Sequence, residues 1–212
     1  TGLNAPVSVG NADLDPELIK MMDLAYTHAS SDHLFVANVY HMSAEDFISR
    51  SRISDSNSLV NTFLNAGSYN RYGAELDFQY RKNQWTSYYN LSYHHQANRH
   101  KTITIPTVAD DIDDQLANGT PRWTASMGKS YKFNNRNQLG ASIRYIDDRD
   151  EIGSLTLVNI NYSYAYKNSE LYMTLRNVLD RTSENPDLSS FVFKRLPRSD
   201  KFNYLIGIKM SF

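Results

Sequence analysis

Three histidines form the first group of residues in this sequence that could do chemistry. His94, His95 and His100 lie where a predicted strand runs into a long polar segment, and histidine is a common ligand of metals and haem. Neighbouring residues of a strand point to opposite faces, so His94 and His95 are poorly placed to share one metal ion. Solvated histidines are therefore the favoured interpretation.

An acidic run offers a second candidate metal site and comprises Asp110, Asp111, Asp113 and Asp114. Carboxylate oxygens suit calcium, but the run lacks the spacing and the glycine of an EF-hand loop. A solvated loop in which like charges repel explains the run better. We predict neither a bound metal ion nor any cofactor.

Four arginines fall in segments that we predict to connect strands, namely Arg50, Arg52, Arg149 and Arg195. The planar guanidinium group suits bidentate recognition of anions, which makes these side chains candidates for binding an anionic small molecule. Ordinary surface charge is the alternative. The sequence shows no Ser/His/Asp arrangement, no glycine-rich phosphate loop and no paired catalytic carboxylates, so we predict that the protein is not an enzyme.

The composition limits the classes of protein that need to be considered. The formal net charge of the 212 residues is −1, so a nucleic-acid partner is not expected. Cysteine is absent, which is compatible with an oxidising compartment. Fifteen Tyr, nine Phe and two Trp are many aromatic residues for so polar a chain, and aromatic girdles are typical of membrane β-barrels. The sequence contains no apolar run of ~18 residues, so no transmembrane helix is predicted.

The last eleven residues alternate between large apolar side chains and smaller or polar ones. The apolar series is Phe202, Tyr204, Ile206, Ile208, Met210 and Phe212. This period of two predicts a strand with one apolar face, and its length matches the apolar band of ~25 Å of a membrane barrel. The alternative is an amphipathic strand that closes a soluble sandwich.

The same alternation recurs along the chain. In residues 70–81, apolar residues share one face, whereas Glu75, Asp77 and Arg81 share the other. These charges would be costly in a dry core, but a water-filled lumen accommodates them. The predicted strands are residues 16–29, 33–43, 70–81, 85–95, 121–133, 138–147, 154–166, 170–179 and 202–212. Within the first of these, residues 17–26 also fit an amphipathic helix, and a further short strand is considered at 6–9.

The connections between these strands alternate in length. Long loops are predicted for residues 44–69, 96–120 and 180–200, and the first of these is expected to have some strand at both ends. Short turns join the strands at their other ends. Short turns on one side and long loops on the other are typical of outer-membrane barrels. We therefore predict an all-β chain, with roughly nine strands of an antiparallel, meandering transmembrane β-barrel.

Segments similar to the motifs of one protein family follow one another in order: 14–17 with 24–26, 38–40 with 46–48, 65–67 with 72–76, 175–181, and 196–198. On these segments the sequence resembles the distal barrel of TonB-dependent outer-membrane receptors. Asp23 and Ala25 stand where the family usually has Glu and Gly, and Thr182 and Ser183 stand where a Tyr is usual. The order and spacing of the motifs make the resemblance specific.

The resemblance implies a barrel of the 22-stranded class, plugged by an N-terminal domain. Since about nine strands cannot make that barrel, residues 1–212 are expected to be its C-terminal part, with the plug absent. Implied functions are uptake of a scarce nutrient, such as an iron–siderophore complex, and energisation by the TonB complex. The implied location is the outer membrane of a Gram-negative bacterium. Other implied partners are therefore outer-membrane lipid and the barrel-assembly machinery. The expected assembly signal is Tyr204, Ile206, Ile208, Met210 and Phe212.

Two other classes of protein compete with this interpretation. A small complete outer-membrane barrel would act as a passive pore, an adhesin or an outer-membrane enzyme, and a tenth strand at 6–9 would give it the even strand number it needs. A soluble β-rich binding domain is the third hypothesis. The sequence that precedes Thr1 in the gene would discriminate between the receptor and the small complete barrel. A plug domain there would indicate the receptor, and a signal peptide directly before Thr1 would indicate the small barrel.

Overall fold

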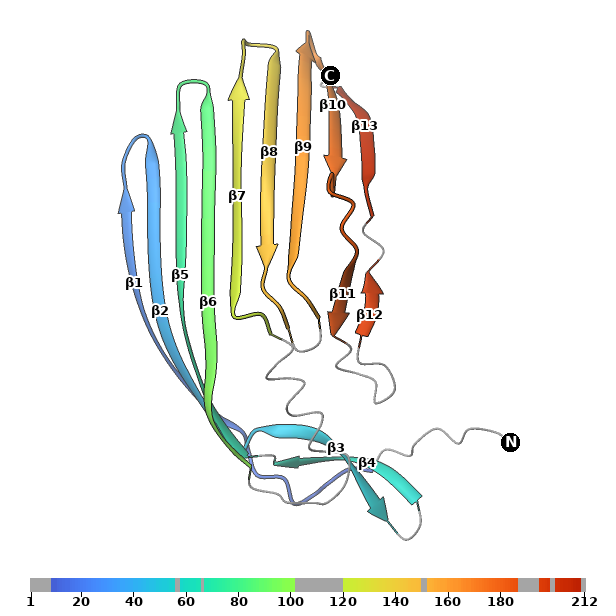
Figure 1. Cartoon of the computed structure of the whole chain (residues 1–212). Helices are drawn as coiled ribbons and strands as arrows, with labels where there is room; N and C mark the ends of the chain where they lie inside the picture. The colour runs from blue at the N-terminus through green and yellow to red at the C-terminus, as the bar shows by residue number, and fades with distance from the viewer. Residues whose placement is uncertain are drawn as a thin grey trace, which may run out of the picture.

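The structure is a computed structural model that describes residues 9–55, 58–65, 67–101, 120–149, 152–186, 195–198 and 201–210. Within these residues the chain forms strands and their connections, and it includes no helix long and apolar enough to cross a membrane. Nine strands make one antiparallel sheet (Figure 1): β1 (Leu18–Ala29), β2 (His33–Glu45), β5 (Gly67–Lys82), β6 (Trp85–Lys101), β7 (Trp123–Lys132), β8 (Asn137–Ile146), β9 (Leu155–Tyr166), β10 (Ser169–Arg176) and β13 (Asn203–Met210).

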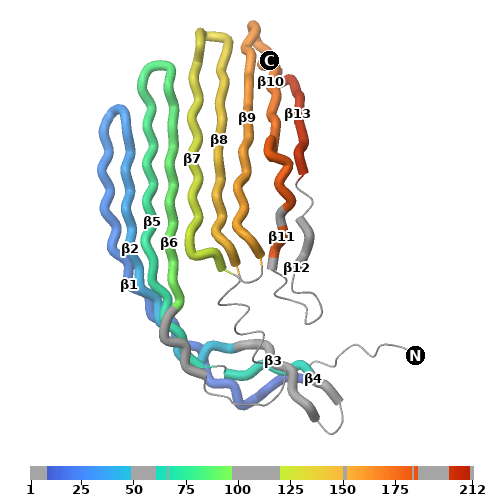
Figure 2. The backbone as a smooth tube through the Cα atoms, in the orientation of Figure 1, coloured from blue at the N-terminus to red at the C-terminus, as the bar shows by residue number. Residues whose placement is uncertain are grey.

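The nine-stranded sheet is a meander with the order β1-β2-β5-β6-β7-β8-β9-β10-β13. Short turns join its strands at one end, as Figure 2 shows, and the longer connections lie at the other end. β13 pairs antiparallel with β10, with Met210 opposite Ser169, so it runs toward the short-turn end. The predicted antiparallel meander of roughly nine strands is confirmed.

The long-connection end carries more regular structure than the sequence predicts. The segment between β2 and β5 forms the hairpin of β3 (Ile48–Asp55) and β4 (Ser58–Asn65), although a long loop was the expectation. β11 (Ser183–Pro186) pairs with β12 (Arg195–Arg198) inside the predicted loop 180–200. Most of the short strand considered at residues 6–9 lies outside the described residues. Val9 is not in a strand and donates its N–H to the carbonyl of Asn61 over 2.9 Å.

β1 settles the one ambiguous element as a strand. Its twelve residues pair with β2 without a break, from Leu18 opposite Glu45 to Ala29 opposite Leu34. Backbone pairing with a neighbouring strand outweighs the weak helical periodicity of this segment. The helix alternative is therefore excluded.

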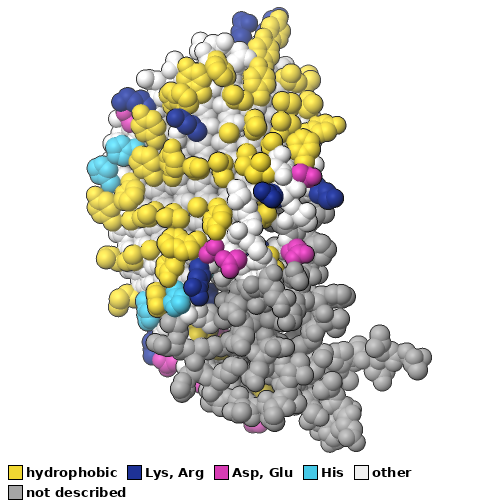
Figure 3. Space-filling model, in the orientation of Figure 1, with side chains coloured by type: hydrophobic (Ala, Val, Ile, Leu, Met, Phe, Trp, Pro, Cys, Tyr) yellow, Lys and Arg dark blue, Asp and Glu magenta, His cyan; other side chains and the backbone are white. Residues whose placement is uncertain are grey.

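The sheet has one apolar and one polar face. Residues opposite each other in the register point the same way, so the apolar residues that alternate along each strand lie together on one side. The apolar face carries Leu24, Val39, Leu76, Leu91, Met127, Ile143, Ile160, Met173 and Ile206. Figure 3 shows hydrophobic side chains spread over the sheet. Leu24 is 72% exposed and Ile206 60% exposed. Only Ala44, Ile152 and Leu155 are buried hydrophobic residues in the described chain, so its large apolar side chains build no dry core.

The short-turn end is held by local polar contacts. The Lys82 ammonium lies 3.0 Å from the Asp32 carboxylate, which ties the β1–β2 turn to the end of β5. The hydrogen bond from Lys82 also lowers the pKa of Asp32. Asn83 has a φ of 53° in the turn to β6, a conformation that asparagine tolerates better than most residues. These features fix the register of the hairpins.

Candidate functional site

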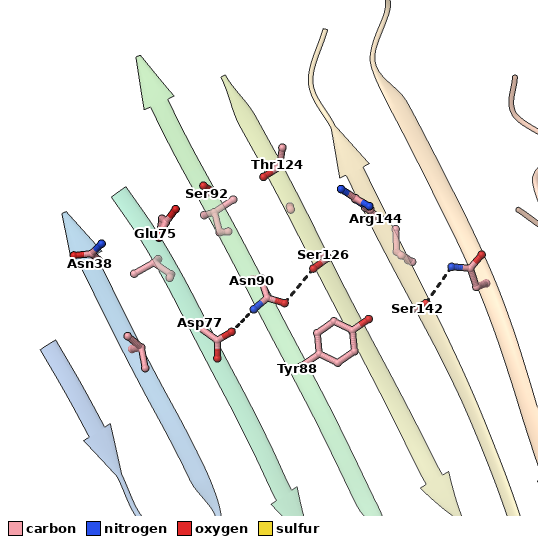
Figure 4. A pocket seen from close by; sticks show the side chains of 16 residues that line it. Asn38, Glu75, Asp77, Tyr88, Asn90, Ser92, Thr124, Ser126, Ser142 and Arg144 are labelled. Atoms are coloured by element: carbon pink, nitrogen blue, oxygen red, sulfur yellow. Dashed lines mark hydrogen bonds between the residues drawn. The ribbon is translucent and has the colours of Figure 1, made fainter. Parts of the chain in front are cut away.

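A polar groove runs across the middle of the polar face and encloses about 550 Å³. Its polar lining comes from six adjacent strands, β2 and β5 to β9, and is drawn in Figure 4. The Asn90 side-chain amide donates to the Asp77 carboxylate, and the Ser126 hydroxyl donates to the Asn90 oxygen over 3.0 Å. This chain of hydrogen bonds crosses β5, β6 and β7 and holds the three side chains in fixed orientations.

Charged side chains of both signs line the groove. Glu75 and Asp77 project from β5, and Arg144 projects from β8 (Figure 4). Beyond one end of the groove, Arg71 donates to the side-chain oxygen of Gln96 over 3.2 Å. The predicted segregation of Glu75, Asp77 and Arg81 onto one face is confirmed by the alternation along β5. The groove offers a hydrogen-bonding wall of mixed charge.

Close contacts between tyrosines and glycines stiffen this wall. A Cβ atom on Gly73 would lie 2.6 Å from Cζ of Tyr40 and would also meet the main-chain oxygen of Tyr93. Tyrosine rings likewise occupy the space beside two more glycines, in the pairs Tyr88–Gly128 and Tyr172–Gly207. Glycine inside a strand commonly marks such a close approach, and the aromatic ring replaces the missing side chain.

The candidate ligand-binding arginines all lie at the long-connection end. Arg50 and Arg52 are in β3, opposite Phe63 and Asn61 of β4, and Arg195 is in β12, opposite Pro186 of β11. Arg149 forms a β-bridge with Ile152. The structure thus places three of these arginines in small hairpins rather than in loops.

Arg149 has contacts of its own with the neighbouring hairpin. Its guanidinium donates to the carbonyl of Glu184 in β11 over 3.0 Å. Arg149, Ile152, Leu155, Thr182 and Glu184 border a pocket of about 280 Å³. Arg149 therefore supports the fold at this end of the sheet, whether or not it also contacts a ligand.

Of the histidine and aspartate clusters, the structure describes the side chains of His94 and His95. His94 pairs with Gly73 on the polar face, whereas the next residue, His95, pairs with Tyr72 on the apolar face, as the alternation predicts. The ring centroids of His95 and Tyr72 are 5.2 Å apart. The side chain of His100 and the run 110–114 lie outside the described residues.

The predicted assembly residues of β13 share the apolar face. Tyr204, Ile206 and Ile208 stand opposite Leu175, Met173 and Leu171 of β10, and all three are at least 60% exposed. Met210 follows in the same register, and Phe212 lies outside the described residues. Their function as an assembly signal stays a prediction.

The residues predicted for the site do not include two side chains that line the groove. Asn90 and Arg144 were detectable from the period of two, since each alternates with a residue of the apolar face. Lys129 also follows this period and therefore lies on the apolar face with Tyr131 and Met127, where a lone charge is unexpected.

Comparison with known proteins identifies the family. The family described as "TonB dependent receptor-like, beta-barrel" matches residues 1–178, and the chain belongs to it. No curated protein matches the sequence.

Solved structures share the fold at low sequence identity. The FrpB iron transporter from Neisseria meningitidis (F3-3 variant) is 13% identical, with a TM-score of 0.73, over 96% of this chain and 32% of that one. The copper transporter OprC is 17% identical, with a TM-score of 0.69, over 95% and 33% of the two chains. The ferric-catecholate import receptor Fiu from E. coli K12 is 13% identical, with a TM-score of 0.70, over 95% and 29%. The chain thus spans about a third of these structures.

Proposed function

We propose that residues 1–212 form the C-terminal part of the barrel of an outer-membrane active transporter, in which other parts of the receptor supply the plug and the contact with the TonB complex. The observation that carries the proposal is the combination of the family match with a meander whose apolar face is exposed and whose polar face is lined by Glu75, Asp77 and Arg144. A lipid-facing surface and a water-filled lumen require these two faces.

The substrate class we propose is a scarce, metal-containing nutrient such as an iron–siderophore complex. The support comes from the printed names of the structural neighbours, which include iron, ferric-catecholate and copper transporters. Ferric siderophores are commonly anionic, and Arg50, Arg52 and Arg195 at the long-connection end suit such a ligand. Arg149, which is tied to Glu184, would serve mainly to hold the β11–β12 hairpin in place.

Energised uptake tests this function. The complete gene product that carries residues 1–212 is expressed in a strain that lacks its own ferric-siderophore receptors, with and without a working TonB protein. We expect radio-iron from at least one catecholate or hydroxamate siderophore to accumulate only when TonB is present. Equal accumulation without TonB would indicate a passive pore, and no uptake of any ferric siderophore would refute the iron substrate.

A further inference from the structure

Lys129 is a charged side chain on the apolar face of the sheet, beside an aromatic cluster. The other charged residue next to Trp85 in the register is Lys82 of β5, which is already paired with Asp32. It lies on β7 between Met127 and Tyr131, which pair with Tyr89 and Trp85 of β6. In the segments of β6 to β13 that these pairings cover, the register places no other Lys, Arg, Asp or Glu on the apolar face. A lysine at the centre of a lipid-facing surface would cost ~2–4 kcal/mol, so its position along the strand matters.

That position is close to the short-turn end of the sheet. β7 ends three residues later, at Lys132, and β6 begins at Trp85, directly after the turn. The Trp85 and Tyr131 rings lie 4.4 Å apart, and the Tyr131 and Phe133 rings 5.1 Å apart. Such an aromatic cluster is typical of the membrane interface, where headgroups and acyl chains meet. In a barrel of the proposed kind, the short turns face the periplasm.

The ammonium of Lys129 lies against the aromatic cluster. Its Nζ lies 4.1 Å from the centroid of the Trp85 ring, well within the range of a cation–π contact. Ser87, opposite Lys129 in the register, is only 5% exposed, so a small buried side chain lies beside the long lysine. The lysine itself is exposed. The structure thus places the charge over the face of the Trp85 ring, where the contact favours this position by about 0.5–1 kcal/mol.

No carboxylate of the described chain neutralises this charge. The ion pairs Lys20–Glu45 and Asp32–Lys82 lie elsewhere, on β1, β2, β5 and the β1–β2 turn. A cation over an aromatic ring at a lipid interface attracts anions, and a phosphodiester is the anion that the interface itself supplies. The aromatic neighbours Trp85 and Tyr131 offer contact to the glycerol backbone and the first acyl carbons.

We propose that Lys129, Trp85 and Tyr131 form a binding site for the phosphate group of an anionic glycerophospholipid in the periplasmic leaflet. The site rests on the proposed membrane location, since only a lipid-facing apolar surface brings headgroups to Lys129. Phosphatidylglycerol has the required chemistry, with one net negative charge, whereas the positive choline group of phosphatidylcholine offsets its phosphate. The lysine thereby recognises a class of lipid and does not merely snorkel to water.

Fluorescence quenching by brominated lipids tests the site in the complete gene product reconstituted into vesicles. The Trp85 signal is the difference between the parent protein and Trp85→Phe. Quenching by brominated phosphatidylglycerol is compared with quenching by brominated phosphatidylcholine at equal mole fraction. We expect a preference of about fivefold for phosphatidylglycerol at low salt, as one basic residue near a membrane surface provides, and a smaller preference at high salt.

Matched variants separate this site from general electrostatic attraction. Lys129→Gln should abolish the preference and Lys129→Arg should retain it. Lys132→Gln should leave it unchanged, because Lys132 pairs with Gln138 on the polar face. Equal quenching by both lipids in the parent protein would overturn the headgroup site while leaving the barrel intact. Absence of quenching by either lipid would overturn the site together with the membrane location.

Discussion

At the scale of single residues, Gly73 shows how the polar wall depends on a missing side chain. The ring of Tyr40 and the main chain of Tyr93 occupy the space that a Cβ would need. We predict that Gly73→Ala lowers the free energy of unfolding by about 1–3 kcal/mol, the usual range for overpacking, because a backbone oxygen cannot move aside as a side chain can.

A denaturant titration of the reconstituted gene product measures this change. Gly153→Ala is the matched control, since nothing lies within 4 Å of a Cβ at that position. Equal stability of the two variants would contradict the packing described for Tyr40.

The hydrogen-bonded chain in the groove gives a second prediction at this scale. Asn90 receives a bond from Ser126 and donates one to Asp77, so Asn90→Leu leaves two polar partners without it. Loss of partners for buried or half-buried polar groups costs about 1–3 kcal/mol each, and water in the groove should reduce this cost. We expect a destabilisation of about 1 kcal/mol in the same titration, and a stabilised variant would contradict the ordered chain of bonds.

At the scale of elements, β13 is the strand whose orientation the proposal needs most. Ile206 pairs with Met173 on the apolar face, and Leu205 pairs with Thr174 on the polar face, at nearly the same depth. Ile206→Lys should cost ~2–4 kcal/mol of folding free energy in lipid, whereas Leu205→Lys should cost much less. Folding titrations of the two variants make the comparison, and equal costs would exclude a lipid-facing Ile206.

The end of the same strand supports a prediction about assembly. Removing Phe212 should lower the amount of gene product in the outer membrane, because residues 202–212 resemble the strand that the barrel-assembly machinery reads as a signal. Immunoblots of outer-membrane fractions give the measurement, with Thr1→Ala as a substitution far from the signal. An unchanged amount of the truncated protein would refute the signal.

Elements with a strict period of two could be predicted from the sequence, and the β3–β4 hairpin could not. β5 alternates Tyr72, Ala74 and Leu76 with polar residues, so its faces followed directly. β3 has the sequence ISRSRISD, in which neither face is apolar, and strands of that kind leave no pattern to detect. The contacts of tyrosines with glycines also escaped prediction, because they depend on the register between strands.

The candidate site likewise has parts that could be predicted from the sequence and parts that could not. The polar character of Glu75 and Asp77 was evident from alternation, but the cross-strand bond between Asp77 and Asn90 required the pairing of β5 with β6. Lys129 occupies a position of the apolar face by the period of two but is charged, so it is an exception to the alternation. Exceptions of this kind tend to mark functional positions.

At the scale of the whole molecule, the described sheet has two strands with a single neighbour, β1 and β13. Unpaired backbone groups cost several kcal/mol each in lipid, so we expect a barrel to close only with further strands from the complete receptor. Residues 1–212 expressed behind a signal peptide should show no heat-modifiable migration, whereas the complete gene product should. Heat-modifiable migration of the short chain would favour a small complete barrel instead.

The central claim is that one face of the sheet contacts lipid and the other a lumen, and spin labelling tests it most directly. Residues 1–212 contain no cysteine, so single cysteines at Leu76, Asp77, Phe78 and Gln79 of β5 can carry nitroxides in a reconstituted gene product whose other cysteines, if present, are replaced by serine. We predict that the labels at Leu76 and Phe78 collide mainly with oxygen, which concentrates in lipid, and those at Asp77 and Gln79 mainly with a water-soluble nickel chelate. The same collision ratio at all four positions, or the reverse alternation, would contradict the account.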